Sequence, residues 1–366
     1  MNSYQKALQE RKKQHLLRSL PLPPEGIDFY SNDYLGLAKC EVLHKRIEAE
    51  YQTLQGQNGA TGSRLLSGNS KYAESVEKKV AAFHHAENAL IYSSGYTANL
   101  GLISSLATKE TTLIMDELVH ASLIDGARLG RSQRVRFKHN NARELEKILK
   151  GSTGQNIVIV ESVYSMDGDI CPLEEVTSIC SKYGTMLIVD EAHSMAIFGN
   201  AGEGLVEELN LEAKVLARIM TYGKGAGIHG AAVVGPEWLR EYQINFSRSF
   251  IFSTAPTNHH FASISALYDH LPSIDKERSD LHEIVSYFVS KRKSHQGTWV
   301  KSNSHIQSLI VPGNSEVIKC GQKLREAGIN ALPIRKPSVP GGEERIRFCL
   351  HAYNTKEEID QLFEVV

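Results

Sequence analysis

The sequence predicts an α/β protein in which helices cover both faces of a mostly parallel sheet. Short, continuous apolar runs recur along the first two thirds of the chain, and such runs are typical of strands buried on both faces. Patterns with helical spacing separate several of the runs, as crossover connections between parallel strands require. From about Thr257 the pattern changes to helices with few strands, which predicts a smaller α+β domain at the C-terminus.

Each predicted element rests on its own pattern. Strands of the large sheet are predicted at residues 89–92, 111–115, 134–137, 157–160, 186–189, 216–220 and 231–234. Helices are predicted in the basic first segment (a broken apolar stripe), at 76–83, at 143–149 with Asn140 or Asn141 as N-cap, and at 173–183. Later elements are strands at 306–311 and 345–350 and helices at 315–327 and after Lys356. We therefore expect a helical segment (1–35), a cofactor-binding large domain (36–256) and a C-terminal α+β domain (257–366).

Composition excludes several classes of protein. The chain has 366 residues, a formal net charge of −1 and 23% charged residues, so nothing favours binding to nucleic acid or to an anionic membrane. Its five cysteines are scattered and contain no C-x-x-C pair, which predicts thiols in a reducing compartment and no metal site. The N-terminus lacks the apolar core of a signal peptide, and no run approaches a membrane span. We expect a cytoplasmic protein.

The stretch RIMTYGKGAGIHGAAVVG places Lys224 between two glycines. A P-loop would need Ser or Thr after the lysine, where this chain has Gly225. Gly225, Gly227 and Gly230 spell G-x-G-x-x-G, but a dinucleotide site needs a helix after the third glycine, and the short β-branched run that follows predicts a strand. Two interpretations remain: a lysine left accessible to a planar ligand, or a solvated lysine in a flexible hairpin.

The predicted carboxyl ends of the strands carry polar side chains. Asp190 and His193 follow the run at 186–189, and His120 lies shortly after the run at 111–115. Thr221 ends the run before Lys224, and Ser93-Ser94-Gly95-Tyr96 follows the run at 89–92 and leads into a helix. Parallel sheets bind ligands at these ends, so we expect the polar groups to form one site.

Pyridoxal 5′-phosphate is one ligand that would use all of these groups. Its aldehyde needs a lysine for a Schiff base, its pyridine nitrogen an aspartate, and its phosphate a helix N-terminus. We assign Lys224 to the Schiff base, Asp190 to the pyridine nitrogen, His193 to the phenolic oxygen and His120 to stacking on the ring. The backbone N–H groups of Gly95 and Tyr96 would bind the phosphate, with Thr221 beside them. Taken singly, each signal is also compatible with a structural or metal-binding role.

The ordered motifs of the chain resemble those of the α-oxoamine synthases. The resemblance covers nearly the whole chain and rests on SNDYLGL, GATGSRLLSGN, SSGYTAN, DELVHASLIDGARL, ESVYSMDGDICPL, VDEAHS, TYGKGAGIHGAAVVG, FIFSTAP and IRKPSVPGGEERIRFCLHA. It implies the fold-type I architecture of pyridoxal-phosphate transferases and a homodimer with active sites at the subunit interface. The implied reaction is a decarboxylative Claisen condensation of a small amino acid with an acyl thioester carried by coenzyme A or a carrier protein.

The resemblance also implies further site residues. Arg347 would pair with the carboxylate of the amino acid, assisted by Asn32, because arginine suits bidentate recognition. Ser165 would contact the cofactor ring or its hydroxyl, and Thr254 would contact the phosphate of the partner subunit. The basic residues Arg11, Lys12, Lys13 and Arg18 either hold the phosphates of the acyl carrier or form a solvated helix face.

Two departures from the family pattern bear on these expectations. Ala73 stands where members of the family often carry a histidine. The role of that histidine therefore does not transfer to this chain. Ser194-Met195-Ala196 replaces a segment that commonly contains a glycine. Within the family, the length and SNDYLGL favour the use of L-alanine and a pimeloyl thioester in biotin synthesis. Alternatives are glycine with acetyl-CoA, serine with palmitoyl-CoA, a non-catalytic relative, or a dinucleotide-dependent oxidoreductase if Gly230 opens a helix.

Overall fold

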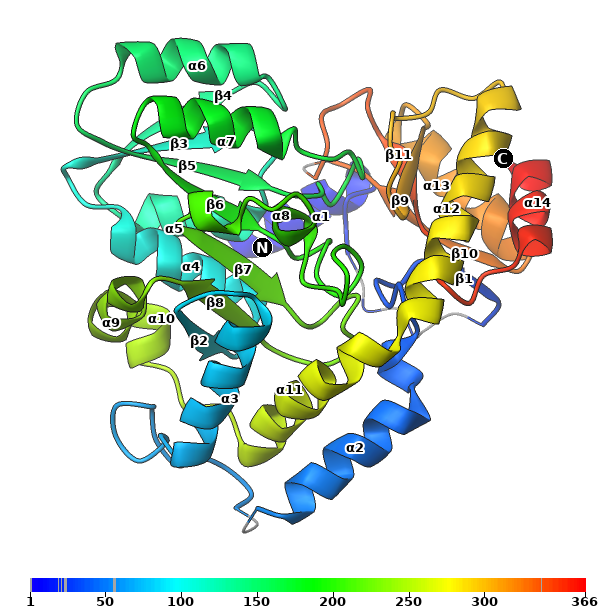
Figure 1. Cartoon of the computed structure of the whole chain (residues 1–366). Helices are drawn as coiled ribbons and strands as arrows, with labels where there is room; N and C mark the ends of the chain where they lie inside the picture. The colour runs from blue at the N-terminus through cyan, green and yellow to red at the C-terminus, as the bar shows by residue number, and fades with distance from the viewer. Residues whose placement is uncertain (1, 19, 21, 23–24, 55–56, 337) are drawn as a thin grey trace. The chain divides into compact units, whose positions relative to one another are not determined.

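The computed structural model describes residues 2–18, 20, 22, 25–54, 57–336 and 338–366 (Figure 1). Its elements fall into two compact units. The first unit contains the residues up to Tyr34, Ser165–Ile170 and Lys276–Val366; the second contains Leu35–Tyr164 and Cys171–Asp275. This division groups the N-terminal segment with the C-terminal elements, and it groups residues 257–275 with the large sheet.

The second unit is built on a seven-stranded sheet with the order β2-β8-β7-β6-β5-β3-β4. Its strands are β2 (Asn88–Tyr92), β3 (Thr111–Asp116), β4 (Gln133–Phe137), β5 (Gln155–Glu161), β6 (Met186–Asp190), β7 (Ala217–Thr221) and β8 (Ala231–Gly235). The strands from β7 to β4 pair in parallel, and β8 runs antiparallel to both β7 and β2. The prediction of a mostly parallel sheet is confirmed, and all seven predicted strands are present.

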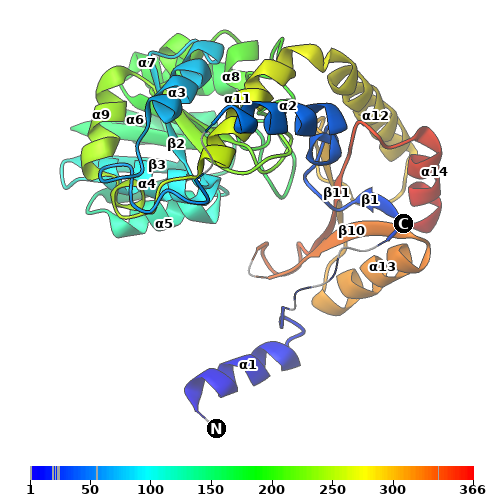
Figure 2. The same cartoon turned by 90° about the horizontal axis from the view of Figure 1, so that it is seen from below.

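Helices cover this sheet on both sides. Figure 2 shows α4 (Gly95–Leu106) and α5 (Ala121–Leu129) on one side, and α3 (Lys71–Phe83) and α7 (Leu173–Lys182) on the other. The remaining helices of the unit are α2 (Glu41–Gln52), α6 (Ala142–Gly151), α8 (Leu205–Glu208), α9 (Glu237–Phe246), α10 (Arg248–Ile251) and α11 (Asn258–His270), with short 3-10 turns at Leu37–Lys39, Glu212–Lys214 and Leu271–Ser273. Because both faces are covered, the central strands are apolar throughout: residues 157–160 and 187–189 are 0% exposed.

Side-chain caps fix where several of these helices begin. Ser70 accepts a hydrogen bond from the backbone N–H of Ala73 at the start of α3, and Ser94 and Thr97 form a reciprocal capping box at the start of α4. Of the two candidate N-caps of α6, Asn141 takes the role by accepting from the N–H of Glu144. Ala73 is fully buried in α3.

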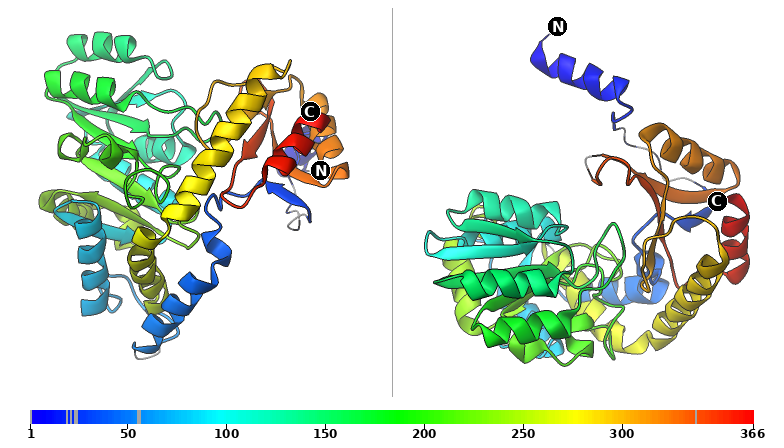
Figure 3. Two further views of the ribbon diagram at one scale, coloured as in Figure 1. Left: turned by 45° about the vertical axis from the view of Figure 1, so that its right-hand side comes forward. Right: turned by 90° about the horizontal axis from the view of Figure 1, so that it is seen from above.

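The first unit contains a four-stranded sheet with the order β1-β10-β11-β9. These strands are β1 (Ile27–Phe29), β9 (Ile306–Ile310), β10 (Ile329–Ile334) and β11 (Arg345–Cys349), and its helices are α1 (Ser3–Lys13), α12 (Asp275–Ser294), α13 (Asn314–Glu326) and α14 (Lys356–Val365). In Figure 3, α13 (orange) and α14 (red) lie beside each other against this sheet. Phe288 of α12 packs 6.3 Å from Phe348 of β11, ring centre to ring centre, in its core. The predicted α+β domain is thus present, although β1 and β10 were not predicted.

Helix α1 is shorter than its apolar stripe suggested. It ends at Lys13, so Leu16 and Leu20 lie beyond it, and none of its residues is buried. Its last turn carries Arg11, Lys12 and Lys13, where positive charge is favourable beside unpaired carbonyl groups.

Candidate active site

Lys224 lies in the turn between β7 and β8 of the second unit. Its Nζ is 2.8 Å from Nε2 of His193, and the residue is partly buried. A Cβ on Gly227 would lie 2.4 Å from the backbone nitrogen of Ala38, and the φ of Gly227 is +67°. Only glycine therefore fits at this position of the turn, which lies directly against the backbone of Ala38. The lysine is therefore held in place, contrary to the solvated-hairpin interpretation. Gly230 leads into strand β8, so the dinucleotide interpretation is wrong.

Asp190 is the last residue of β6 and is 3% exposed. Its carboxylate accepts hydrogen bonds from the side-chain amide of Asn99 (2.7 Å) and from the backbone N–H of Ala192 (3.0 Å). Among the residues that the structure describes, no cation forms a salt bridge with it. A buried carboxylate normally needs a cationic partner, so this position fits a protonated ring nitrogen of a bound ligand.

A chain of hydrogen bonds connects Asp190 to His120. The amide nitrogen of Asn99 also lies 2.9 Å from Oγ of Ser122, and that hydroxyl lies 2.7 Å from Nδ1 of His120. Asn99 and Ser122 are 2% and 0% exposed. His120 caps the start of α5 and is itself exposed, so its flat ring is accessible to a planar ligand. Desolvation by the surrounding protein lowers the pKa of this imidazole, which favours its neutral form.

Glu161 adds a second buried acid beside Asp190. The two residues are Cα partners at the ends of the parallel strands β5 and β6. Burial raises the pKa of Glu161 well above its ordinary value, and the charge of Asp190 acts in the same direction. The carboxyl group accepts a hydrogen bond from the backbone N–H of His120. Glu161 therefore fixes the backbone at His120, and its burial favours the neutral form of its own carboxyl group.

The start of α4 forms a cradle suited to a phosphate. A Cβ on Gly95 would lie 2.6 Å from Oγ1 of Thr221, so glycine lets the helix terminus approach that hydroxyl. The first N–H groups of a helix have no partner within the helix and attract anions. Tyr96, the second residue of α4, donates its phenolic hydroxyl to Asp125 (2.6 Å), while its backbone N–H remains at the helix start. Gly95, Tyr96 and Thr221 thus fit the predicted phosphate site.

Arg347 of β11 provides a possible carboxylate site in the first unit. It is 3% exposed, and its Nη2 lies 3.1 Å from Oδ1 of Asn32 and 3.3 Å from the hydroxyl of Tyr34. Its Nε has no hydrogen-bond partner, and no acidic residue in the described part of the chain forms a salt bridge with it. Arg345, two residues earlier, is by contrast ion-paired with Asp167 and Glu343. Arg347 is therefore the arginine of the pair that can accept a carboxylate ligand.

Two further site residues were predicted, Ser165 and Thr254. Ser165 begins the loop segment that belongs to the first unit, and Thr254 is exposed in the second unit after α10. An exposed Thr254 is compatible with a contact to a partner subunit.

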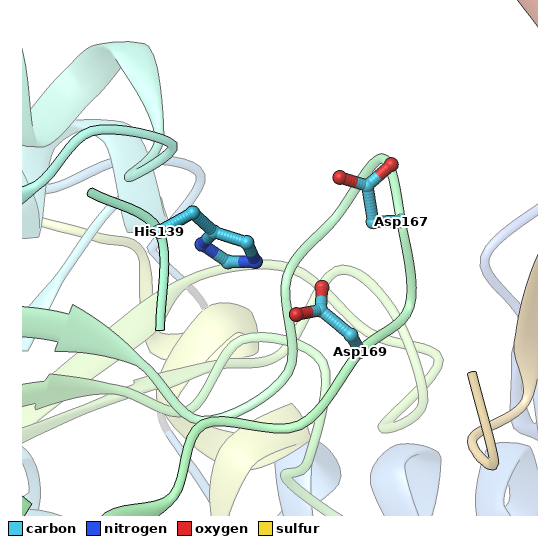
Figure 4. A group of neighbouring side chains, drawn as sticks. All are labelled: His139, Asp167 and Asp169. Carbon is cyan, nitrogen blue, oxygen red and sulfur yellow. The ribbon is translucent and has the colours of Figure 1, made fainter. Parts of the chain in front are cut away.

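Figure 4 shows three side chains with metal-ligating atoms: His139, Asp167 and Asp169. His139 belongs to the second unit, where its Nδ1 lies 3.0 Å from Oδ1 of the buried Asp116. The two aspartates lie on the loop segment of the first unit, where Asp167 is ion-paired with Arg345. These contacts give His139 and Asp167 structural roles within their own units.

Sequence reasoning missed Asn99, Ser122, Glu161 and Tyr34. The signal for Asn99 was a polar residue between Ala98 and Leu100 in an otherwise apolar helix, since a buried amide needs partners. Glu161 directly follows a strand of four apolar residues, in the same position as Asp190 in its strand. Neither signal names the partner, which depends on how α4, α5, β5 and β6 pack.

Comparisons with known proteins identify the family. The model of the class I and II aminotransferases matches residues 24–366. The chain belongs to this family. A protein of Geobacillus kaustophilus (strain HTA426) named as a putative 8-amino-7-oxononanoate synthase is 39% identical over 345 residues, covering 93% of this chain and 87% of the relative. The 8-amino-7-oxononanoate synthase of Emericella nidulans is 36% identical over 389 residues, covering 100% of this chain and 94% of the relative.

Solved structures show the same architecture. The serine palmitoyltransferase of Sphingomonas wittichii matches with a TM-score of 0.90 and 28% identity, covering 99% of this chain and 95% of that chain. The 8-amino-7-oxononanoate synthase of Francisella tularensis matches with a TM-score of 0.81 and 28% identity, covering 93% of this chain and 96% of that chain.

The protein is thus a fold-type I, pyridoxal-phosphate-dependent, acyl-transferring enzyme related to the 8-amino-7-oxononanoate synthases. Bound cofactor is named in the serine palmitoyltransferase of S. paucimobilis, with a TM-score of 0.89 and 26% identity over 100% of this chain and 96% of that chain. Within the described ranges, no helix combines the length and the apolarity needed to cross a membrane.

Proposed function

We propose that the protein condenses L-alanine with a pimeloyl thioester, giving 8-amino-7-oxononanoate, carbon dioxide and the free thiol of the carrier in biotin biosynthesis. The relatives with this name support the proposal because they are 35–39% identical over nearly the whole chain. The observation that carries it is a set of three polar groups: Asp190 and Arg347 are buried and form no salt bridge with any residue that the structure describes, and Lys224 lies 2.8 Å from His193. A cofactor with a cationic ring and an amino acid with a carboxylate supply the missing partners.

We assign binding of the cofactor to the second unit. Lys224 would attach it covalently, Asp190 would hold the proton on its ring nitrogen, and His120 would stack on its ring. His193, adjacent to Lys224, would donate to the phenolic oxygen, and Gly95, Tyr96 and Thr221 would bind the phosphate, with Thr254 of the partner subunit. Bound pyridoxal phosphate supplies an electron sink for the electrons released when bonds to Cα break.

The amino acid requires separate groups. Arg347 would bind its carboxylate, with Asn32 holding the guanidinium in orientation, and Ser165 would contact the cofactor. The free amine of Lys224 would take the proton from Cα of the amino acid and would later return one. Acyl transfer then precedes loss of carbon dioxide, because decarboxylation is easy after the new β-keto group can accept the electrons. We also propose a cytoplasmic homodimer, in keeping with cysteines that are all thiols.

A second candidate function is supported by the solved structures. The serine palmitoyltransferases superpose with TM-scores up to 0.90, so use of L-serine with palmitoyl-CoA is the main alternative. Glycine with acetyl-CoA is the other alternative within the family. A non-catalytic relative is disfavoured, because Lys224 and its contact with His193 are retained.

Substrate assays test the proposal directly. The enzyme is incubated with L-alanine, glycine or L-serine, each with pimeloyl-CoA, acetyl-CoA or palmitoyl-CoA, and thiol and carbon dioxide are measured. We expect strong preference for L-alanine with pimeloyl-CoA and one thiol released per carbon dioxide. A marked preference for either other pair would move the assignment to that activity. Carbon dioxide released without a thioester would indicate a simple decarboxylase.

Lys224→Ala provides the matched test of the covalent site. Borohydride treatment of the wild-type protein should fix the cofactor to the peptide that contains Lys224. The variant should bind the cofactor noncovalently and lose turnover by several orders of magnitude, because both the attachment and the proton carrier are absent. Cofactor fixed to another lysine would refute the assignment.

A further inference from the structure

Two acceptors lie beside one nitrogen of the Arg347 guanidinium. Its Nη2 is 3.1 Å from Oδ1 of Asn32 and 3.3 Å from the hydroxyl of Tyr34. That hydroxyl donates to the same Oδ1 of Asn32 at 2.9 Å, which closes a triangle of three hydrogen bonds. Tyr34 is 0% exposed and Arg347 is 3% exposed, so water has little access to these contacts.

The triangle restricts the orientation of the guanidinium. Arginine recognises a carboxylate through two parallel N–H bonds, so the plane of the guanidinium must be fixed for the pair to form. Nε of Arg347 has no hydrogen-bond partner among the described residues, and it stays available to a ligand while Nη2 is held. Without the hydroxyl of Tyr34, Nη2 loses one of its two acceptors, and ordering the side chain on binding then costs more.

The backbone on both sides of Asn32 is held by the residues that follow β11. The N–H of Ala352 donates to the carbonyl group of Tyr34 at 2.8 Å. On the other side of Asn32, Nε2 of His351 lies 3.1 Å from the carbonyl oxygen of Ser31. The chain that leaves β11 therefore holds the segment that contacts the arginine of that strand.

The fully buried His351 bridges two carbonyl groups of this segment, because its Nδ1 also lies 2.9 Å from the carbonyl oxygen of Asp28. The side chain of Asp28 accepts the backbone N–H groups of Tyr30 (2.8 Å) and Ser31 (2.9 Å), an arrangement typical of a turn. The imidazole and the turn together give Asn32 a defined backbone position.

We propose that Tyr34 and His351 are positioning residues for the carboxylate site of Arg347. Tyr34 orients the guanidinium through its hydroxyl, and His351 holds the backbone from which Asn32 reaches it. Neither side chain needs to touch the amino acid. The inference rests on the proposed function, because it takes the carboxylate of an amino acid as the ligand of Arg347.

Three variants test this assignment. Tyr34→Phe removes the hydroxyl and keeps the buried ring, and His351→Gln leaves one amide donor group in place of two ring nitrogens. His351→Asn replaces it if that variant does not fold. Tyr353→Phe is the matched control: its ring stacks on His351 at 4.7 Å between centres and its hydroxyl donates to Asp28 at 3.1 Å, but none of the described contacts joins it to Arg347.

Two ligands separate the orientation of the guanidinium from general damage to the site. They are L-alanine and L-alaninamide, which has no carboxylate. The Kd of each is measured on the cofactor-loaded enzyme from the change in absorbance of the cofactor. The KM and kcat for L-alanine with pimeloyl-CoA, the cofactor affinity and the midpoint of thermal unfolding complete the comparison.

We expect Tyr34→Phe to raise the Kd and the KM for L-alanine about tenfold relative to the control, the usual order for losing a hydrogen bond to a charged group. Its kcat, its cofactor affinity and its Kd for L-alaninamide should match those of the control. The variant of His351 should shift the same two constants in the same direction by a smaller factor, because one carbonyl contact remains.

A Kd for L-alanine in Tyr34→Phe equal to that of the control would overturn the proposal, and so would an equal rise of the Kd for L-alaninamide. An unchanged Kd in the folded variant of His351 would overturn the part assigned to that residue. If the wild-type enzyme prefers glycine or L-serine, the proposed function fails, and the same ratio of Kd values is measured with that amino acid. A wild-type enzyme that binds no amino acid would reject both.

Discussion

The side-chain amide nitrogen of Asn99 lies 2.7 Å from a carboxylate oxygen of Asp190 and 2.9 Å from the hydroxyl of Ser122. Through Ser122 this one amide connects the acid proposed for the ring nitrogen with His120, proposed to stack on the ring. Asn99 lies one turn after Gly95 on α4, so a single helix contributes both to the phosphate cradle and to the placement of Asp190.

Asn99→Ala should weaken cofactor binding and turnover together. A hydrogen bond to a charged group contributes about 1.5–3 kcal/mol, which corresponds to roughly a 10- to 100-fold loss in kcat/KM. The measurements are cofactor affinity by absorbance titration and kcat/KM with L-alanine. Ser122→Ala is the matched control, because it breaks the link to His120 and leaves the Asn99–Asp190 contact intact. If both variants lose cofactor affinity equally, the contact with Asp190 is not the important one.

Arg347→Lys should raise the KM for L-alanine at least tenfold while the fold remains intact. Lysine keeps the charge but cannot form the bidentate pair with a carboxylate. Arg345→Lys is the comparison, since Arg345 is already ion-paired with Asp167 and Glu343. That variant should lower thermal stability and leave the KM for L-alanine nearly unchanged. The reverse pattern, with KM affected by position 345 and not by 347, would exchange the two roles.

Asp190→Asn and Glu191→Gln should have opposite consequences. Asp190→Asn removes the negative charge beside the ring nitrogen and should suppress turnover, with the folded protein largely retained. Glu191 is fully buried and accepts the backbone N–H groups of Leu205 and Val206 at the start of α8. Its amide variant leaves one of these donors without an acceptor, at a cost of about 1–3 kcal/mol. Denaturant unfolding and initial rates separate the two effects, and equal loss of activity at both positions would mean that the ring-nitrogen partner has been misplaced.

The large sheet was predictable because most of its strands are continuous apolar runs, β4 with its two arginines being the exception. The small sheet was harder to predict for reasons visible in two strands. Strand β1 has only three residues, and one of them is the half-buried, charged Asp28. Strand β10 contains Pro333, and a proline within an apolar run argues against a strand. Pro333 is accommodated because Gly321 of α13 leaves room for the proline ring. A Cβ on Gly321 would lie 2.4 Å from Cγ of Pro333.

The chemical groups of the site were predictable from strand ends, whereas their connections were not. Spacing alone does not distinguish Arg345 from Arg347, because alternate residues of a strand share a face. The distinction depends on Asp167, which is distant in sequence and pairs with Arg345. In the same way, the link from Asp190 to His120 depends on α4 bringing Asn99 to Asp190 and to Ser122, tertiary contacts that no local pattern contains.

Ala196→Gly should stabilise the protein. The φ of Ala196 is +72°, in the left-handed region that costs an L-residue with a Cβ about 1 kcal/mol or more. Its N–H is bonded to the carbonyl of Gly202 (2.9 Å), and a Cβ on Gly202 would lie 2.8 Å from Ala196, so the backbone cannot relax to a negative φ without losing this contact. Glycine removes the strain, offset in part by the greater entropy of the unfolded chain. Urea unfolding should show a net gain in the free energy of unfolding of a few tenths to about 1 kcal/mol with an unchanged m-value.

Ala192→Gly is the control, because Ala192 lies two residues after Asp190 and outside the left-handed region. This control should be neutral or destabilising. If Ala196→Gly lost as much stability as the control, residue 196 would not be strained.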